Sequence, residues 1–287
     1  MSRTFTWKLT DRTLTIGRRP LLMGIVNVTP DSFSDGGQFF APEKAVEHGR
    51  ELIAEGADIL DIGGESTRPN ATPVTLQDEL VRVIPVVTAL AKQVQVPLSI
   101  DTSKAEVARQ ALTAGAHIIN DVTGLAGDPA MVEVARSFGA GVVVMHMQGT
   151  PQTMQLDPQY KDVVPEVKHY LKMRFHALTQ QGIDPECIAL DPGIGFGKRQ
   201  QHNLELLAGL STFLDFGRPL CLGVSRKGFI NRVLNRTGPV EQGDCGTVGV
   251  LLHALSNGTV HIARVHNVRA VHDAMRMFLA LEEVGKQ

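Results

Sequence analysis

Short apolar segments alternate with longer amphipathic segments along almost the whole chain. The apolar segments are rich in Val, Ile and Leu and are continuous, a pattern typical of parallel strands that are covered on both faces. Between them, the spacing of apolar residues predicts helices, for example over 42–56, 75–93 and 103–115, with Thr75 and Thr102–Ser103 as candidate N-caps. We predict eight strands, near residues 21–28, 57–64, 97–102, 117–122, 141–147, 187–193, 219–225 and 260–266.

Eight strands that are each followed by a helix predict an α/β fold of the (β/α)8 TIM barrel type. The alternative is an open doubly wound sheet, which needs a switch point in strand order that the sequence does not locate. The segment 4–17 is typical of a hairpin that turns at Asp11–Arg12. We therefore expect one domain over residues 1–287, in which residues 1–20 form an N-terminal β-hairpin that caps the lower end of the barrel.

Composition and charge narrow the class of protein. Hydrophobic residues make up 43% of the chain and charged residues 20%, as in soluble globular proteins. The net charge of −2 gives no reason to expect a nucleic-acid partner. No signal peptide or apolar run of about 20 residues is found, so we expect no membrane span. The odd, widely spaced cysteines Cys187, Cys221 and Cys245 are typical of a reducing, cytoplasmic location.

A glycine-rich stretch at 190–198, LDPGIGFGK, is similar to a phosphate-binding loop, but its spacing is wrong for one. In a P-loop the first glycine would fall on Pro192, and the final Ser or Thr on Arg199. In the dinucleotide fingerprint that begins at Gly193, the third glycine would fall on Lys198. The loop therefore has another purpose, and the aspartate at its start becomes a candidate ligand-binding residue.

Nearly every predicted strand ends in a side chain able to form strong hydrogen bonds. A single aspartate at a strand end is usually a cap or a turn former. Eight such strand ends on one face are better explained by an active site, which in a TIM barrel lies at the carboxyl ends of the strands. These residues are Asn27, Glu65–Arg68, Asp101, Asn120–Asp121, His146, Asp191, Ser225–Lys227, Arg264 and His266.

The strand-end residues divide into two chemical groups. Asp101, Asn120 and Asp191 offer acceptors and an amide, which suit a flat heterocycle with adjacent N–H donors. The other group offers donors and positive charge, which suit phosphate oxygens. We therefore predict a ligand with a planar polar ring at one end and a phosphate or pyrophosphate at the other. The second group consists of Arg68, Lys227, Arg264 and His266.

Several stretches resemble, in order, the motifs of the dihydropteroate synthases: NVTPDSFSDGG, DIGGESTRP, SIDTSK, IINDV, VVVMHMQGTPQ, LDPGIGFGK, GVSRKGFI and RVHNV. The resemblance runs from about residue 21 to about residue 275. It implies a folate-biosynthesis transferase that joins 6-hydroxymethyl-7,8-dihydropterin diphosphate to 4-aminobenzoate, releasing 7,8-dihydropteroate and pyrophosphate. It also implies a dissociative mechanism, in which the bond to diphosphate breaks first, and a homodimer.

The resemblance assigns a role to each matching residue. It places the pterin against Asp101, Asn120, Asp191, Lys227, Met145 and Phe196. It places the diphosphate against Asn27, Thr67, Arg68, Arg264 and His266, with Mg²⁺ bound by Asn27. It places 4-aminobenzoate against Thr67, Ser225, Phe33 and Lys227. The residues expected to take part in catalysis are Lys227, Asp101, Asp191, Arg264 and His266.

Two other functions remain open at this point. A pterin-binding methyltransferase of the same barrel type would share the acidic and amide residues but has no use for the cationic group. A scaffold barrel without catalysis should have a broken site, whereas every assigned position is filled. The long polar connections 29–40 and 66–76 are expected to be functional, closing over the bound substrates to exclude water.

Overall fold

The computed structural model describes residues 4–29, 42–68 and 71–285. Phe33 and most of the connection 29–40 lie outside these residues, as do residues 69–70 of the second connection. The predicted strands are all present and run parallel. They are β3 (Leu21–Asn27), β4 (Ile59–Gly63), β5 (Leu98–Asp101), β6 (Ile118–Asp121), β7 (Gly141–Met145), β8 (Ile188–Asp191), β9 (Cys221–Leu222) and β10 (Ile262–Val265).

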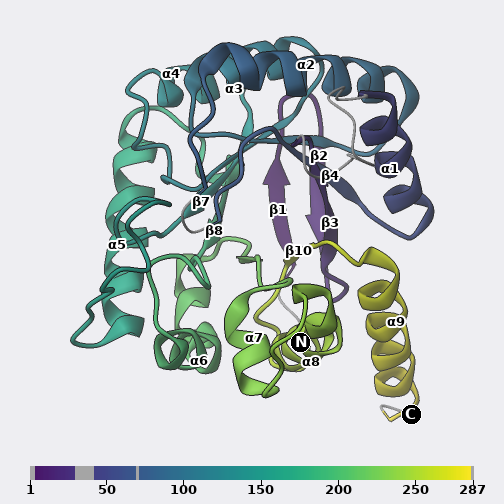
Figure 1. Ribbon diagram of the computed structural model, residues 1–287, viewed down its shortest axis with the longest axis vertical. Helices are drawn as coiled ribbons and strands as arrows, with labels where there is room; N and C mark the ends of the chain where they lie inside the picture. The colour runs from purple at the N-terminus through teal and green to yellow at the C-terminus, as the bar shows by residue number, and fades with distance from the viewer. Residues whose placement is uncertain (1–3, 30–41, 69–70, 286–287) are drawn as a thin grey trace.

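Helices follow the strands in sequence and surround them in space (Figure 1). Within the described ranges, none of them is long and apolar enough to cross a membrane. The α-helices are α1 (Pro42–Ala54), α2 (Leu76–Gln93), α3 (Ala105–Thr113), α4 (Met131–Phe138), α5 (Val163–Gln180), α6 (Gln200–Ala208), α7 (Gly228–Val233), α8 (Asp244–Ser256) and α9 (Val268–Val284). The 3-10 helices are η2 (Pro185–Cys187), η3 (Leu210–Phe216) and η4 (Val240–Gly243).

The parallel sheet closes on itself. Its strand order is β8-β7-β6-β5-β4-β3-β10-β9, and a parallel bridge between Leu190 and Leu220 joins the two outermost strands. The amide of Leu190 also donates to the carbonyl oxygen of Pro219 at 2.9 Å. The TIM barrel prediction is therefore confirmed, and the open doubly wound sheet is excluded.

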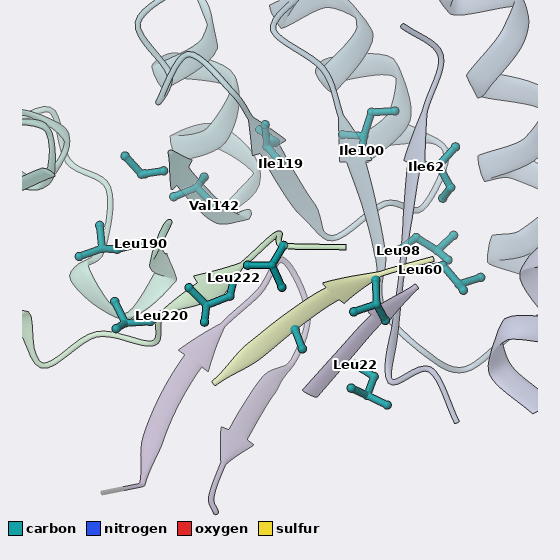
Figure 2. Close-up of a cluster of buried hydrophobic side chains, with 14 of the residues drawn as sticks. Leu22, Leu60, Ile62, Leu98, Ile100, Ile119, Val142, Leu190, Leu220 and Leu222 are labelled. Atoms are coloured by element: carbon teal, nitrogen blue, oxygen red, sulfur yellow. The ribbon is translucent and has the colours of Figure 1, made fainter. Parts of the chain in front are cut away.

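The strands are continuously apolar because both of their faces are buried. Figure 2 shows the outer set, which includes Leu22, Leu60 and Leu98 and packs against the helices. The neighbouring positions, such as Met23 and Ile59, belong to a second cluster in the barrel interior. Toward the carboxyl ends of the strands the interior positions become polar, so the same alternation that builds the core also directs polar side chains into the barrel.

An antiparallel hairpin, β1 (Phe5–Lys8) and β2 (Thr13–Ile16), precedes the barrel as predicted. Its apolar side chains, among them Phe5, Trp7 and Ile16, pack against the interior residues of the first half of the strands. Trp7 is fully buried, and its indole N–H donates to the carbonyl oxygen of Cys187 at 2.8 Å. The hairpin thus covers the end of the barrel opposite the strand-end residues.

One of the two predicted N-caps is confirmed. The Thr75 hydroxyl accepts a hydrogen bond from the Asp78 amide at the start of α2. The prediction of Thr102–Ser103 was wrong, because Lys104 has an extended backbone and α3 begins only at Ala105. Thr102 Oγ1 does accept a hydrogen bond from the Lys104 amide, but Lys104 precedes the helix. The first helical amide, that of Ala105, donates to Asp128 Oδ2.

We predict that Trp7→Ala lowers the free energy of unfolding by about 3–5 kcal/mol, because it opens a cavity in the base of the barrel and strands the carbonyl oxygen of Cys187. Urea unfolding followed by circular dichroism measures the change. Thr13→Ala, at an exposed position of the same hairpin, is the control and should unfold like the wild type. Equal unfolding of all three proteins would contradict a structural role for the hairpin.

Candidate active site at the carboxyl ends of the strands

A cavity of about 1100 Å³ lies where the carboxyl ends of the strands converge. Four predicted site residues are almost completely buried and are not part of its described lining: Asn120, Met145, Asp191 and Phe196. Phe33 lies outside the described residues, so its place in the site stays a prediction. The predicted site residues that line the cavity are Asn27, Thr67, Arg68, Asp101, Ser225, Lys227, Arg264 and His266.

A partly buried guanidinium connects three strands at the base of the cavity. Arg264, near the end of β10, donates from Nε to Asp61 Oδ2 and from a terminal nitrogen to Asp101 Oδ2, both at 2.6 Å. Asn120, on β6, donates its amide to the same oxygen of Asp61 at 3.0 Å. Arg264 was expected beside the diphosphate, and here it lies among the acceptor residues. Its contact with diphosphate stays a prediction.

Burial and charge oppose each other in this group. Burial alone would lower the pKa of Arg264, yet the carboxylates of Asp61 and Asp101 raise it, so the guanidinium is always charged. Burial raises the pKa of Asp101 to about 7; Arg264 opposes this shift, and the charge of Asp61 reinforces it. The cavity base therefore contains a carboxyl group that exchanges its proton close to neutral pH.

Asp191 and Lys227 form a second charged group beside the first. Asp191 Oδ1 accepts a hydrogen bond from the Gly193 amide at 2.7 Å, while burial raises the pKa of this carboxyl to about 6. Burial, together with the positive charge of Arg264, lowers the pKa of Lys227 to about 8. Gly223 lies between Asp191 and Arg264. A Cβ at this position would be 3.9 Å from Asp191 Oδ2 and 4.0 Å from Arg264 Cδ.

An apolar surface adjoins these charges. Met145 and Phe196, both predicted to contact a pterin, belong to one cluster with Val122 and Met154. The ammonium of Lys227 lies 3.8 Å from the centroid of the Phe196 ring, a cation–π contact. A flat ring bound here would meet apolar side chains on its face and charged acceptors at its edge.

The glycine-rich loop obtains its shape from its own lysine. Lys198 is 1% exposed, and its ammonium donates at 2.9 Å to the carbonyl oxygens of Gly193 and Phe196. It also contacts His146 Nδ1 at 2.9 Å. Gly193 has φ +69°, and a Cβ there would overlap the carbonyl oxygen of His146. The lysine that suggests a phosphate cradle in the sequence therefore binds the loop's own backbone.

Ser225 and His266 form a pair whose geometry is that of a nucleophile and its base, with Oγ 3.0 Å from Nδ1. The serine oxygen also accepts from the His266 amide at 3.2 Å. In the tautomer in which Oγ donates to Nδ1, the ring carries its proton on Nε2. Burial and nearby cations lower the pKa of His266 to about 3. An imidazole this weakly basic does not activate a serine, but a neutral Nε2–H can donate to an anion.

The rim of the cavity is more open. Arg68 is exposed and Thr67 is partly exposed, both in the connection after β4. Asn27 ends β3, and no hydrogen bond of its side chain is found in the part of the chain that the structure describes. Across those same residues, no group of three or more His, Cys, Asp or Glu side chains is placed to hold a metal ion.

Two residues of this site were missed in the sequence. Asp61 had a signal, because it is a lone charge inside the apolar strand ADILDIGG, and a buried charge must be paired. Lys198 had none, because nothing in a loop sequence tells whether its lysine points to a ligand or to the loop's own carbonyl groups. His146, one of the predicted strand-end residues, contacts Lys198 and is not among the described residues that line the cavity.

Comparisons with known proteins agree with this geometry. The pattern of the family described as "Pterin binding enzyme" matches residues 23–266. The dihydropteroate synthase of Escherichia coli strain K12 is 48% identical over 258 residues, which cover 90% of each protein. Dihydropteroate synthase of Xanthomonas albilineans, solved with 4-aminobenzoic acid, has a TM-score of 0.90 at 44% identity, over 98% of this chain and 99% of that one. Its complex with 7,8-dihydropteroate has a TM-score of 0.87 at 42% identity, over 96% and 98% of the two chains.

A family match that begins in β3 and ends at His266 includes every strand of the barrel and every described site residue, so the fold and site are those of a pterin-binding enzyme. Within that class, the chain belongs to the family of dihydropteroate synthases, because identity of 48% extends over nine-tenths of both proteins.

We predict that Lys198→Met lowers the free energy of unfolding at pH 9 by about 2–4 kcal/mol. The methionine keeps the length of the side chain but leaves two buried carbonyl oxygens without a donor, each costing about 1–3 kcal/mol. Urea unfolding, followed through the fluorescence of the single tryptophan, measures the difference.

The difference in free energy of unfolding between the wild type and Lys198→Met should also depend on pH. Burial lowers the pKa of Lys198 to about 7 from an ordinary value of 10.5, so between these values the unfolded chain binds the additional proton. The stability that Lys198 contributes therefore grows as the pH rises from about 7 toward 10.5, and it is lost as the pH falls back over that interval. A cost of Lys198→Met that is smaller at pH 9 than at pH 7 would contradict this.

Proposed function

We propose that the chain condenses 6-hydroxymethyl-7,8-dihydropterin diphosphate with 4-aminobenzoate to give 7,8-dihydropteroate and pyrophosphate. It is a transferase of folate biosynthesis. The observation that carries the assignment is the position of Asp101, Asn120 and Asp191 at the carboxyl ends of three barrel strands, next to a cavity that Asp101 lines together with the cations Lys227 and Arg264. Related enzymes have been solved with 4-aminobenzoic acid and with 7,8-dihydropteroate bound.

The pterin ring binds at the base of the cavity. Asp191 accepts hydrogen bonds from the ring's N–H groups, because only one of its oxygens is engaged by the loop amide of Gly193. Asp101 and Asn120 meet the ring from the neighbouring strands, and Lys227 donates to a ring oxygen or nitrogen. The apolar cluster that contains Met145 and Phe196 covers a face of the ring.

The diphosphate binds toward the rim. Thr67, Arg68 and His266 donate to its oxygens, and Arg264 adds positive charge from below. The amide oxygen of Asn27 fits Mg²⁺, a hard cation that proteins often bind through few side chains plus substrate phosphates. When bound there, the ion would neutralise negative charge on the departing diphosphate.

The 4-aminobenzoate binds at the mouth, against Thr67, Ser225 and the stem of Lys227, which all line the cavity. The Ser225 hydroxyl is oriented by His266, so its position is defined before the substrate arrives. We also expect Phe33 to contact 4-aminobenzoate.

We propose a dissociative reaction. The bond between the pterin methylene and the diphosphate oxygen breaks first, and the amine of 4-aminobenzoate then attacks the resulting cation. The weakly basic His266 argues against a serine nucleophile, which this reaction does not need. Asp101 and Asp191 stabilise positive charge on the ring, while Arg264 and His266 stabilise the leaving anion.

One measurement, the release of pyrophosphate, distinguishes the synthase from the two alternatives, a pterin-binding methyltransferase and a scaffold. A methyltransferase of this barrel type has no role for the donors at the rim, and a scaffold would bind pterin without turnover. Release of pyrophosphate that depends on 4-aminobenzoate supports the synthase. Pterin binding without that release would favour the scaffold.

We predict that Lys227→Ala and Arg264→Ala each lower turnover by roughly 100- to 1000-fold, because each removes a cation that lines the cavity and acts on developing charge. Pyrophosphate release with both substrates and Mg²⁺ measures this. Lys168→Ala, which removes an exposed surface ion pair with Asp215, is the matched control and should leave turnover unchanged. Turnover of either site variant at the wild-type rate would count against the assignment.

The pH dependence of pterin binding should identify Asp191. Its carboxylate accepts ring N–H groups only when ionised, and burial raises its pKa to about 6, so affinity for the pterin diphosphate should fall as the pH drops through 6. Asp191→Asn should bind more weakly at pH 8 and lack the part of the dependence centred near pH 6. Calorimetric titration between pH 5.5 and pH 8 measures both, and an unchanged profile in the variant would refute the role.

The proposal includes a homodimer in the cytoplasm. Exposed apolar side chains on α9, namely Met277, Leu281 and Val284, support an interface on that helix. The cysteines are unpaired, which supports a reducing location.

A further inference from the structure

Asp61 is a fully buried charge that no substrate contact explains. It lies on β4, has no exposed surface and is not among the described residues that line the cavity. It sits one interior layer below the cavity, where its cross-strand neighbour on β5 is Ser99. Burying a carboxylate is costly unless it is paired, so its partners indicate what it does.

Both partners of Asp61 are residues that the proposed function uses. The oxygen Oδ2 accepts from Arg264 Nε at 2.6 Å and from Asn120 Nδ2 at 3.0 Å. The other oxygen, Oδ1, is buried without a hydrogen bond in the described part of the chain. One atom thus organises two side chains that come from strands on opposite sides of β4 in the sheet order.

The contact with Asn120 decides which end of its amide faces the ligand. An asparagine side chain has a donor end and an acceptor end, and either could point upward. Because the NH₂ group donates down to Asp61, the carbonyl oxygen is left for the ligand. A ligand that offers an N–H at this position is favoured over one that offers a lone pair.

The contact with Arg264 restricts the guanidinium in a similar way. Asp61 holds Nε and Asp101 holds one terminal nitrogen, which leaves the other terminal nitrogen for a ligand. Charge-assisted hydrogen bonds of this length also fix the plane of the group. Without Asp61, Arg264 would retain a single carboxylate partner and could rotate toward Asp101 or the diphosphate.

We infer that Asp61 is a positioning residue, which orients the amide of Asn120 and the guanidinium of Arg264 for the pterin without touching it. The inference deepens the proposed function and rests on it. Its role is to prearrange acceptors and donors, so that binding does not have to order them.

Graded variants test the inference. Asp61→Leu removes the acceptor at similar volume, whereas Asp61→Asn keeps an oxygen that can accept from Arg264 and Asn120. We expect Asp61→Leu to weaken binding of 6-hydroxymethyl-7,8-dihydropterin diphosphate by about 10- to 100-fold in calorimetry, the loss of a charged hydrogen bond. Asp61→Asn should recover part of that loss. Ser99→Ala, at the neighbouring buried position without a contact to either partner, is the control and should bind like the wild type.

A readout without ligand separates this inference from the proposed function. The Arg264 Nε–H proton should give a distinct nitrogen–proton NMR signal in the wild type, assigned by its absence in Arg264→Lys. Asp61→Leu should shift that signal and speed its exchange with water, while Ser99→Ala should not. An unchanged signal in Asp61→Leu overturns the inference whether or not the protein binds pterin.

The binding outcomes are equally decisive. If Asp61→Leu binds the pterin diphosphate as the wild type does, Asp61 does not position the site. If Ser99→Ala loses as much affinity as Asp61→Leu, the loss reflects general disturbance of the interior and the inference fails. If the wild type does not bind the probe, the proposed function fails, and the NMR comparison still decides the role of Asp61.

Discussion

The site depends on one partly buried guanidinium shared by two carboxylates. Arg264 from β10 reaches Asp61 on β4 and Asp101 on β5 at 2.6 Å each. β10 and β4 are both neighbours of β3 in the sheet, so side chains about 200 residues apart in sequence lie in one interior layer. Burial and the neighbouring charges raise the pKa of Asp101 to about 7, and the two carboxylates raise the pKa of Arg264.

Packing and polar chemistry are segregated along the barrel axis. At the lower end, apolar interior residues and the hairpin with Trp7 form a dry core. At the upper end, the same interior positions carry Asp101, Asn120 and Asp191. The packed lower half keeps the strands together, and so fixes the spacing of the polar groups that the same strands carry at their upper ends.

The glycine-rich loop illustrates how a sequence motif can mislead. Gly193 and Gly197 are required because the backbone there passes close to the carbonyl oxygens of His146 and Gln148, which leave no room for a side chain. Its lysine binds the carbonyl oxygens of Gly193 and Phe196, and so holds the loop that carries Asp191 and presents Phe196 to Lys227. The lysine of a P-loop donates to a bound phosphate, whereas Lys198 donates to carbonyl oxygens of its own loop.

The sequence by itself determined the barrel, the hairpin and the strand-end residues, because hydrophobic periodicity and strand ends are local features of the chain. It did not determine how those residues pair. The place of Arg264 among the acceptors, the inward turn of Lys198 and the hidden role of Asp61 depend on which side chains the closed sheet brings together. Pairing of buried charges is decided by distance and by the loss of water, and both exist only in the folded barrel.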